Sequence, residues 1–368
     1  MTIPTVSASI FMRPDPDLHV DIVYLWVNGS DPVWRRKRQR AATRLSASHL
    51  NAMALYGNVE GRFRDNDELR YSLRALTRFF PDHGHIYVVT DNQVPAWLKP
   101  SSRLTLVDHR DLIPADKLPT FDSGNIESYI HRIPNLSERY FYFNDDVFFG
   151  APVQLDDWFY EGGTYVAWSD DPVVTNEPLR SDATALENAC RLSHQWLGAV
   201  QSTGPAPDWL PNGVAPYEPV FRTFAHSPRP MLKSRLRMLE VLAPELFEGV
   251  RSTVFRAWDK PTIVSDFVLR WALAHGQARL REHSHVYLST GDGVDGQLDD
   301  QLNALAAAVG QLDFFCINDT TDDALAHDPR LGRVREALQK IFPNPSAFEQ
   351  SMQPARRTKT KPQVMSVV

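Results

Sequence analysis

An apolar, aromatic run with two adjacent carboxylates inside it constrains the fold of this chain more than any other feature. Residues 141–150 read FYFNDDVFFG. A run so rich in Phe, Tyr and Val is typical of a buried strand in an α/β sheet. Burying two ionised carboxylates side by side without a partner costs several kcal/mol. We therefore expect the strand to stop at this point, so that Asp145 and Asp146 emerge at its carboxyl end.

The expected position of these two carboxylates suits a ligand site, because open α/β sheets bind ligands at the carboxyl ends of their strands. A divalent cation at this edge would neutralise Asp145 and Asp146. Asn and Asp also favour turns, so the alternative interpretation of residues 144–146 is a simple turn between two strands.

The segment from 20 to 149 alternates between strand and helix patterns. β-Branched and aromatic residues predict strands at 21–27, 85–91 and 104–108, and polar residues follow each of them. Apolar residues with the spacing i, i+4, i+7 predict a helix over 66–76. Such alternation indicates a three-layer α/β domain with a largely parallel sheet.

Beyond residue 150 the pattern becomes mainly helical. Helical periodicity covers 180–200, 231–247, 262–275 and 297–309, and a late strand is expected at 314–319.

The segment 202–219 interrupts this helical part with five prolines. Prolines prevent regular pairing, so we expect a long loop here. Trp209 and Tyr217 would suit it to be a mobile flap that stacks on sugar rings, while a rigid surface excursion is the alternative interpretation.

Composition sets broad limits on function. The net charge of −6 argues against a general nucleic-acid-binding protein. The two cysteines, Cys190 and Cys316, form neither a disulfide framework nor a zinc-binding pattern, which fits a reducing compartment. No window approaches the roughly 20 apolar residues that span a bilayer, and residues 1–16 lack the apolar core of a signal peptide. We therefore expect a cytoplasmic protein, with at most peripheral contact with the inner face of the membrane.

Three predicted strands end in acidic or amide residues: Asp145 and Asp146 after the first run, Asp319 after the last strand, and Asp91 after 85–91. In a parallel sheet such ends meet at one edge and could share a hard cation, Mg²⁺ or Mn²⁺. For Asp91 alone, a turn or helix-capping role is the favoured interpretation.

Several basic residues are candidates for binding an anionic substrate. Arginine suits bidentate contacts with phosphate, although a single arginine is more often a solvated surface residue. His226 follows the Pro-rich segment and could act as a general base, with a structural histidine as the alternative. The basic candidates besides His226 are Arg70, Arg74, His131, Arg132, Arg191 and Arg256.

The order of these segments resembles the Stealth family of sugar-phosphate transferases. This family includes bacterial capsular-polysaccharide phosphotransferases and the catalytic domain of the lysosomal-enzyme N-acetylglucosamine-1-phosphotransferase. The resemblance rests on residues 21–32, 64–98, 126–149, 225–256 and 296–319. It therefore covers most of the chain.

The resemblance implies a GT-A-like nucleotide-sugar-binding domain with a helical lobe. It also implies transfer of a hexose 1-phosphate, such as N-acetylglucosamine 1-phosphate, from a UDP-sugar to a hydroxyl of an acceptor glycan, free or lipid-linked. The products would be a phosphodiester and UMP, in capsule or cell-surface polysaccharide synthesis. Two alternatives stay open: a glycosyltransferase that releases UDP, and a non-catalytic carbohydrate-binding protein.

The composition and the succession of these patterns predict a division of the chain. We expect a flexible leader at 1–18, a catalytic domain at 19–350 and a disordered basic tail at 351–368. Within the catalytic domain, the expected parts are a donor-binding half at 19–170, a mainly helical acceptor-side lobe at 171–295, and closing helices and a strand at 296–350.

The resemblance also assigns roles to individual residues. The implied metal ligands, for Mg²⁺ or Mn²⁺, are Asp145, Asp146 and Asp319. The implied catalytic residues are His226, Arg256, Arg191 and Asp146. The implied nucleotide- or substrate-binding residues are Trp26, Asn28, Gly29, Asn66, Asp67, Arg70, Arg74, His131 and Arg132. Asn28 is a departure, because bacterial relatives often carry Asp there, and it bears on nucleotide contacts rather than on the reaction.

Overall fold

The computed structural model describes residues 19–202, 218–291, 296–322, 324 and 328–350. The predicted leader and tail lie outside the described residues, as do Trp209 and Tyr217 of the Pro-rich segment.

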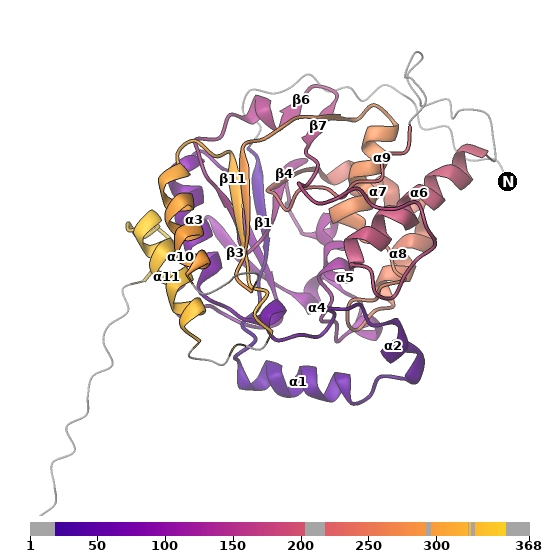
Figure 1. Cartoon of the computed structure of the whole chain (residues 1–368), viewed down its shortest axis with the longest axis horizontal. Helices are drawn as coiled ribbons and strands as arrows, with labels where there is room; N and C mark the ends of the chain where they lie inside the picture. The colour runs from indigo at the N-terminus through magenta and orange to yellow at the C-terminus, as the bar shows by residue number, and fades with distance from the viewer. Residues whose placement is uncertain (1–18, 203–217, 292–295, 323, 325–327, 351–368) are drawn as a thin grey trace, which may run out of the picture.

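A five-stranded sheet with the order β3-β2-β1-β4-β8 forms the centre of the molecule (Figure 1). Strands β1 (Asp21–Leu25), β2 (Ile86–Thr90), β3 (Leu104–Asp108) and β4 (Arg139–Asn144) run parallel to one another. The edge strand β8 (Arg229–Leu232) is antiparallel to β4. The predicted α/β class with a mostly parallel sheet is confirmed.

Both faces of this sheet are covered, which explains why its strands are continuously apolar. Alternate residues of β4 point to opposite sides: Phe141 and Phe143 join one buried cluster, whereas Tyr140 and Tyr142 join the other. Helices α3 (Glu68–Phe79), α10 (Gln297–Ala308) and α11 (Pro329–Ile341) form one outer layer, as Figure 1 shows.

The opposite outer layer, called the helical lobe below, is formed by helices both before and within the segment 171–295. It contains α5 (Ser123–Glu127), α7 (Lys233–Leu242), α8 (Pro244–Arg251) and α9 (Val268–Ala274), whose apolar residues share a cluster with the second face of the sheet. The prediction of one helix over 231–247 is corrected, because a strand opens this segment and Pro244 at the first position of α8 starts a new helix.

The aromatic run 141–149 forms two strands rather than one. β4 ends at Asn144, Asp145 and Asp146 make a turn, and β5 (Val147–Phe149) continues into a second sheet. Both interpretations of this run are therefore correct in part, since the strand ends at the acidic pair and the pair is also a turn.

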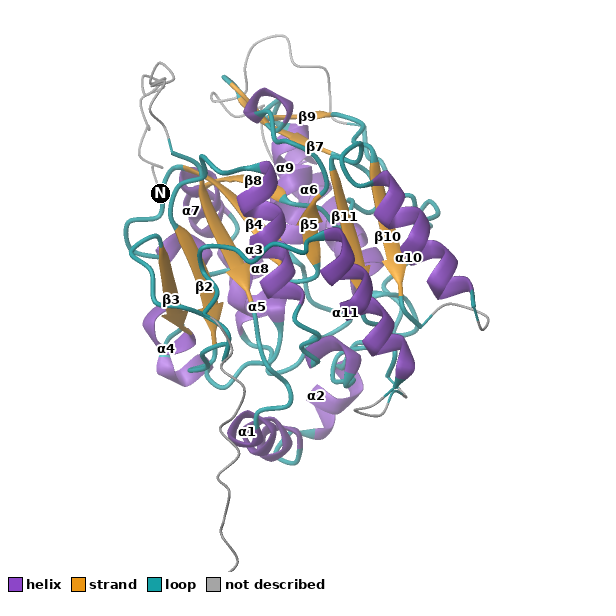
Figure 2. Cartoon of the chain, turned by 90° about the vertical axis from the view of Figure 1, so that its left-hand side faces the viewer, coloured by secondary structure: helices purple, strands orange, loops and turns teal. Residues whose placement is uncertain are grey.

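The second sheet has the order β10-β11-β5, and Figure 2 shows it beside the central sheet. β10 (His285–Ser289) is parallel to β11 (Phe314–Asn318), and β5 is antiparallel to β11. The pairing of β5 with β11 brings residues near 145 close to residues near 318.

Shorter elements complete the described structure. A third sheet has the order β6-β7-β9. No helix among the described residues combines the length and the apolar character needed to cross a membrane. The remaining elements are α1 (Pro32–Ala42), α2 (Ala47–Ala52), α4 (His109–Leu112), α6 (Ala185–Ser202), the 3₁₀ turns Gly61–Phe63, Ala115–Lys117, Ile130–Arg132 and Leu155–Asp157, the π-turn Ile263–Phe267, β6 (Phe159–Tyr160), β7 (Gly163–Val166) and β9 (Ala278–Leu280).

Candidate functional site

A pocket of about 850 Å³ opens at the carboxyl ends of β1 and β4. The chain leaves β1 toward β2 and β3 on one side and later returns to β4 on the other, so this edge is where the strand order reverses. Such a reversal leaves a crevice between the two strand ends, and ligands of open α/β sheets bind there. The pocket is lined by Trp26 after β1 and by the turn residues Asp145 and Asp146 after β4.

Acidic residues gather on the side of the pocket next to α3. Burial raises the pKa of Asp145 well above its usual value, and the nearby carboxylates of Glu68, Asp146 and Asp65 raise it further. Burial likewise raises the pKa of Glu68 to about 8 and that of Asp65 to about 6. Among the described residues, no Lys, Arg or His forms an ion pair with Asp65, Glu68 or Asp145. The cluster therefore lacks a compensating positive charge, which a bound cation would supply.

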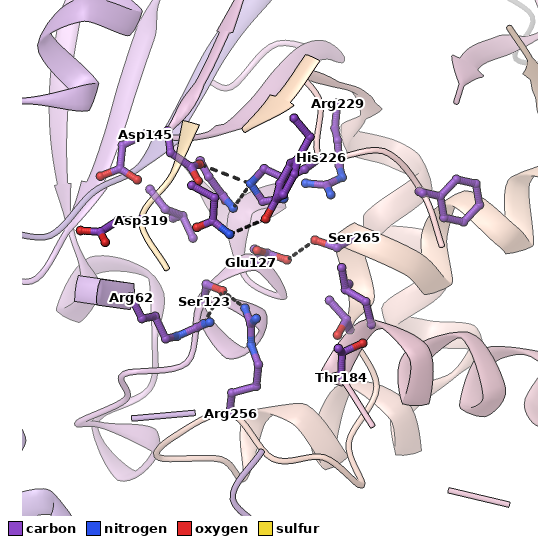
Figure 3. A pocket seen from close by; sticks show the side chains of 18 of the residues that line it. Arg62, Ser123, Glu127, Asp145, Thr184, His226, Arg229, Arg256, Ser265 and Asp319 are labelled. Carbon is purple, nitrogen blue, oxygen red and sulfur yellow. Dashed lines mark hydrogen bonds and ion pairs between the residues drawn. The ribbon is translucent and has the colours of Figure 1, made fainter. Parts of the chain in front are cut away.

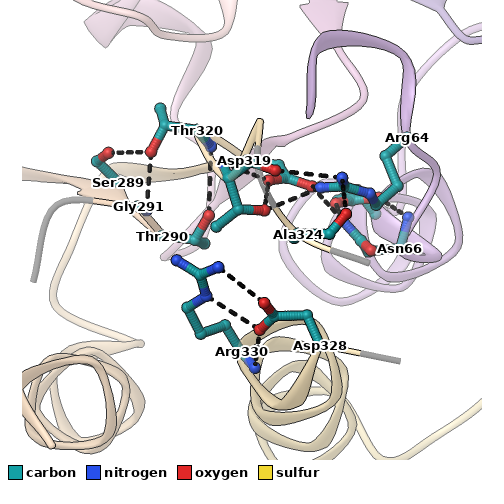
Figure 4. Close-up of polar contacts among 12 residues, drawn as sticks. Arg64, Asn66, Ser289, Thr290, Gly291, Asp319, Thr320, Ala324, Asp328 and Arg330 are labelled. Carbon is teal, nitrogen blue, oxygen red and sulfur yellow. Dashed lines mark hydrogen bonds and ion pairs between the residues drawn. The ribbon is translucent and has the colours of Figure 1, made fainter. Parts of the chain in front are cut away.

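Asp319 lines the same pocket, but its carboxylate already accepts hydrogen bonds from an arginine and from a side-chain amide (Figure 4). Arg64 Nη1 donates to Asp319 Oδ2 at 2.5 Å, and Asn66 Nδ2 donates to the same oxygen at 3.1 Å. Asn66 Nδ2 also donates to Glu68 Oε1 at 2.8 Å, so this amide links Asp319 to the acidic cluster. The structure thus brings Asp319 close to the predicted metal site while giving it a partner of its own in Arg64.

Arginine side chains line other parts of the pocket, and in Figure 3 those of Arg62 and Arg256 converge on Ser123. Arg256 Nη2 and Arg62 Nη2 both donate to Ser123 Oγ, at 2.6 and 3.1 Å. Burial, and to a smaller extent the positive charge of Arg256, lower the pKa of Arg62 to about 9. Arg229 is only 2% exposed, and its Nε has no hydrogen-bond partner among the described residues. These arginines form a cationic wall that would attract an anion.

Sequence reasoning identified Arg256 in this wall but missed Arg62 and Arg229. A usable signal existed for Arg229, which stands three residues after His226 in one of the segments that carry the family resemblance. No local pattern marks Arg62, since its position depends on the packing of the 3₁₀ turn Gly61–Phe63 against the pocket.

A row of hydrogen bonds links the two sides of the pocket. Tyr142 Oη lies 2.7 Å from Glu127 Oε1 and 2.6 Å from Asn144 Oδ1. Asn144 Nδ2 lies 3.1 Å from His226 Nε2, which in turn lies 3.3 Å from Asp146 Oδ1. Two of the predicted catalytic residues, His226 and Asp146, therefore lie together at one end of this row.

Cys316, on β11, completes a second potential metal-binding group. Its Sγ lies 3.5 Å from Asp146 Oδ2, and the ligand atoms of Asp146, His226 and Cys316 all lie within 4.8 Å of one another. A set of oxygen, nitrogen and sulfur atoms suits transition metals better than Mg²⁺. Burial raises the pKa of Cys316 well above its usual value, and the charge of Asp146 adds to this effect.

The loop after β1 shapes the pocket without exposing all of its predicted residues. Trp26 lines the pocket, whereas Asn28 and Gly29 do not. The backbone N–H of Asn28 donates to Gln93 Oε1 at 2.9 Å. Gly29 donates to the carbonyl of Phe63 at 2.7 Å, and a Cβ at this position would collide with that carbonyl.

Other predicted site residues do not line the pocket, and most of them contact residues elsewhere in the fold. Arg70 and Arg74 share one face of α3, as predicted, but that face pairs with Glu349. The remaining placements are as follows: His131 and Arg132 contact Glu240, Arg191 donates to Thr175 and Asn188, Asp67 stands before α3 with no side-chain capping bond, and Asp91 pairs with Lys37.

Solved structures with a similar arrangement include the galactosyltransferase LgtC in complex with donor and acceptor sugar analogues. The match has a TM-score of 0.38 at 10% identity and covers 87% of this chain and 95% of LgtC. Core-mannan synthase A from Aspergillus fumigatus, in its Mn/GDP form, has the same TM-score of 0.38 at 9% identity, with 75% and 74% covered. At these scores the likeness is too distant to carry an argument.

Curated relatives give a closer match in sequence. The chain is 34% identical over 339 residues to exopolysaccharide phosphotransferase SCO2592 of Streptomyces coelicolor, covering 90% of this chain and 33% of that protein. It is 33% identical to SCO6023 of the same organism, covering 96% and 56%. The capsular polysaccharide phosphotransferase cps1A of Actinobacillus pleuropneumoniae is 37% identical, with 50% of each chain covered. The chain thus spans between a third and about three-fifths of these relatives.

Sequence models of the conserved regions of Stealth proteins match this chain directly. Conserved region 1 matches residues 18–46, region 2 matches 62–167 and region 4 matches 310–360, which together make up about half of the chain. The acidic pair Asp145–Asp146 lies within the second region and Asp319 within the fourth. The chain belongs to the Stealth protein family.

Proposed function

We propose that this protein transfers a hexose 1-phosphate from a UDP-sugar to a hydroxyl group of an acceptor glycan. The acceptor oxygen bonds to the β-phosphorus, the bond between that phosphorus and the bridging oxygen breaks, and UMP leaves. The carrying observation is that one pocket sets an uncompensated acidic cluster opposite three arginines. The names of the relatives, exopolysaccharide and capsular polysaccharide phosphotransferases, support the same reaction class.

In this proposal Asp145 and Asp146 hold a divalent cation, Mg²⁺ or Mn²⁺. Such an ion, when bound, neutralises negative charge on the diphosphate. The fit rests on Asp145, which lies half-buried beside other carboxylates and has no ion-pair partner within the described structure. Asp319 would support the site through Asn66, which bonds both Asp319 and Glu68.

Arg62, Arg229 and Arg256 are proposed to bind the phosphate oxygens of the donor. Phosphoryl transfer depends mainly on positioning and on charge stabilisation, and planar guanidinium groups supply both. Ser123 holds Arg62 and Arg256 together through its hydroxyl. Arg256 Nε also lies 3.6 Å from Asp122 Oδ1, so the protein balances part of this positive charge, and a phosphate group would add further negative charge beside the two guanidinium groups.

His226 is proposed to take the proton from the acceptor hydroxyl. Its Nε2 faces the pocket 3.3 Å from Asp146 Oδ1, so a carboxylate is at hand to stabilise the imidazolium that forms. The acceptor would enter from the side of the helical lobe, which we propose as the acceptor-side part of the chain, opposite the donor-binding half at 19–170. The acceptor glycan, free or lipid-linked, would meet the protein at the cytoplasmic side of the membrane.

Product analysis tests this function directly. The protein is incubated with a panel of UDP-sugars, Mg²⁺ or Mn²⁺, and oligosaccharide acceptors, and the released nucleotide is identified. We expect UMP and an acceptor that carries a phosphodiester-linked sugar. Release of UDP would instead establish glycosyl transfer, and binding of UDP-sugar without any turnover would indicate a carbohydrate-binding protein.

A further inference from the structure

Helix α1 and the segment that follows it are strongly basic. Residues 32–59 contain six arginine or lysine side chains and neither aspartate nor glutamate, although the net charge of the whole chain is −6. A charge of one sign concentrated in this way produces a local potential that attracts an anionic partner. Half of these cations have acidic partners in the fold: Lys37 pairs with Asp91, and both Arg35 and Arg38 pair with Glu60.

The other three cations, Arg36, Arg40 and Arg44, are exposed and form no ion pair among the described residues. Arg36 and Arg40 stand four positions apart, so they share one side of α1. The opposite side of the helix is buried through Trp34 and Arg38. Helix α1 therefore packs on the protein by one side and presents positive charge on the other, at the lower edge of the molecule in Figures 1 and 2.

Large apolar side chains are exposed soon after these arginines in the chain. Leu50 in α2, and Leu55 and Tyr56 after it, are each more than half exposed. Single exposed apolar residues are ordinary, whereas basic and apolar side chains gathered on adjoining segments are typical of surfaces that rest on a membrane. Cations on such surfaces contact the lipid head groups, and Leu and Tyr enter the boundary between the head groups and the acyl chains.

The pocket lies directly behind this exposed surface. Trp34 lines the pocket from the inner side of α1. The backbone N–H of Ala54 donates to the carbonyl of Arg256 at 2.8 Å. The loop that carries Leu55 and Tyr56 is therefore joined to the segment that carries Arg256 of the cationic wall.

We propose a docking surface for an anionic phospholipid bilayer, formed by Arg36, Arg40, Arg44, Leu50, Leu55 and Tyr56. An anionic polysaccharide would also be attracted by the arginines, but it would leave the exposed leucines without a role. The inference deepens the proposed function, because docking on this surface holds the pocket close to lipid-linked acceptors, and it rests on that function for this purpose alone. Binding to vesicles can be measured without any reaction.

Co-sedimentation with vesicles tests the proposal. The full-length protein is mixed with vesicles of phosphatidylcholine alone or with about 30% phosphatidylglycerol, in about 0.1 M salt, where charges act over about 10 Å. We expect much tighter binding to the anionic vesicles, even though the protein and these vesicles carry net charge of the same sign. Raising the salt to about 0.5 M should weaken this binding, because salt screens the charges.

Two double substitutions with the same change in net charge locate the binding. Arg36→Glu/Arg40→Glu should weaken binding to the anionic vesicles at least about 20-fold, since each cation near an anionic surface contributes about fivefold. Arg237→Glu/Lys340→Glu is the matched control, because both residues are exposed on other helices, α7 and α11, and form no ion pair within the described structure. It should bind as wild type does. Thermal unfolding followed by circular dichroism would show that both variants are folded.

A third variant tests the apolar part of the docking surface. Leu50→Gln/Leu55→Gln should weaken binding severalfold at both salt concentrations, because salt does not screen an apolar contact. Equal binding of the wild type to neutral and anionic vesicles, or unchanged binding in the arginine or the leucine variant, would overturn the proposal.

Two further outcomes separate this proposal from its alternatives. Retention on immobilised dextran sulfate without binding to vesicles would assign the arginines to an anionic polymer and overturn the docking surface. Vesicle binding that depends on Arg36 and Arg40, in a protein that transfers no sugar phosphate, would uphold the docking surface and instead refute the proposed function.

Discussion

Arg229 shows how a single residue can point to a ligand. Its side chain is buried in the pocket wall, yet its Nε has no hydrogen-bond partner within the described structure. Leaving a charged donor unsatisfied in a buried position costs more than leaving a neutral one, so native proteins keep such groups where a ligand completes them. The charge of Arg229 acts on the carboxyl group of Glu127, whose pKa is nevertheless raised by burial, and no ion pair of Arg229 is found within the described structure.

The substitution Arg229→Lys tests this reading of the cationic wall. Lysine keeps the charge but loses the planar fork that matches phosphate oxygens. We expect kcat/KM for the UDP-sugar to fall about 10- to 100-fold, because hydrogen bonds to charged groups contribute about 1.5–3 kcal/mol each. Steady-state kinetics with varied donor would measure the loss.

Arg235→Lys provides the matched control for that experiment. Arg235 is also buried, at 3% exposed, and its Nε likewise has no hydrogen-bond partner within the described structure. Its Nη1 and Nη2 donate to Thr164 Oγ1 at 3.1 Å and to the carbonyl of Gln277 at 2.8 Å, and it does not line the pocket. Its replacement should lower stability and leave donor kinetics nearly unchanged. Equal losses in both variants would mean that Arg229 acts on the fold rather than on the donor.

At the scale of elements, α3 contributes both to the site and to the packing of the C-terminal part of the chain. Its first residue, Glu68, belongs to the acidic cluster, while Arg70 and Arg74 hold the segment after α11 through Glu349. The side chains of Arg74 and Glu349 are each 3% exposed, and Arg74 Nη2 lies 2.7 Å from Glu349 Oε2. The helix therefore anchors the C-terminal part of the described chain to the outer layer formed by α3, α10 and α11.

Removal of Arg74 should thus change stability rather than chemistry. Breaking a buried ion pair leaves an uncompensated charge, which typically costs about 3–5 kcal/mol. We expect Arg74→Met to lower the free energy of unfolding in urea by that amount, while kcat and KM of the folded fraction stay close to wild type. Arg78→Met, at an exposed position of the same helix, should have little effect. A rise in donor KM specific to Arg74→Met would restore the substrate-binding role that the sequence suggested.

Asp145 and Arg74 illustrate which features of the structure could be predicted from the sequence and which could not. The strands β1 to β4 and the exit of the acidic pair at their edge follow from local patterns, since a buried strand cannot continue through two carboxylates. The partner of Arg74 could not be predicted in this way, because Glu349 lies 275 positions away. Short strands such as β6 and β9 also escaped prediction, since they depend on tertiary pairing more than on local preference.

At the scale of the whole molecule, the site joins parts of the chain that are far apart in sequence. Trp26, Asp145, His226, Arg256 and Asp319 all line one pocket between the sheet and the helical lobe. The pairing of β5 with β11 and of β8 with β4 holds these parts together. A ligand bound in this pocket should therefore affect the stability of the whole fold and not only that of one element.

The acidic cluster makes that effect dependent on pH. The pKa of Glu68 is raised from 4.5 to about 8 and that of Asp65 from 3.8 to about 6, so the folded protein binds more protons than the unfolded chain between these limits. The stability that protonation provides is complete below about pH 4 and is lost as pH rises toward 8. A bound divalent cation favours the ionised carboxylates and would offset this loss.

We therefore expect 10 mM Mg²⁺ to raise the melting temperature more at pH 8 than at pH 5.5, by at least about 2 °C in thermal unfolding. Asp145→Asn removes one of the repelling charges, so it should raise the melting temperature of the metal-free protein at pH 8 and abolish most of the Mg²⁺ effect. Asp116→Asn, at an exposed position, should behave like wild type. An Mg²⁺ effect that is the same at both pH values, or that persists in Asp145→Asn, would place the cation away from this cluster and leave Asp65, Glu68 and Asp145 to share protons instead.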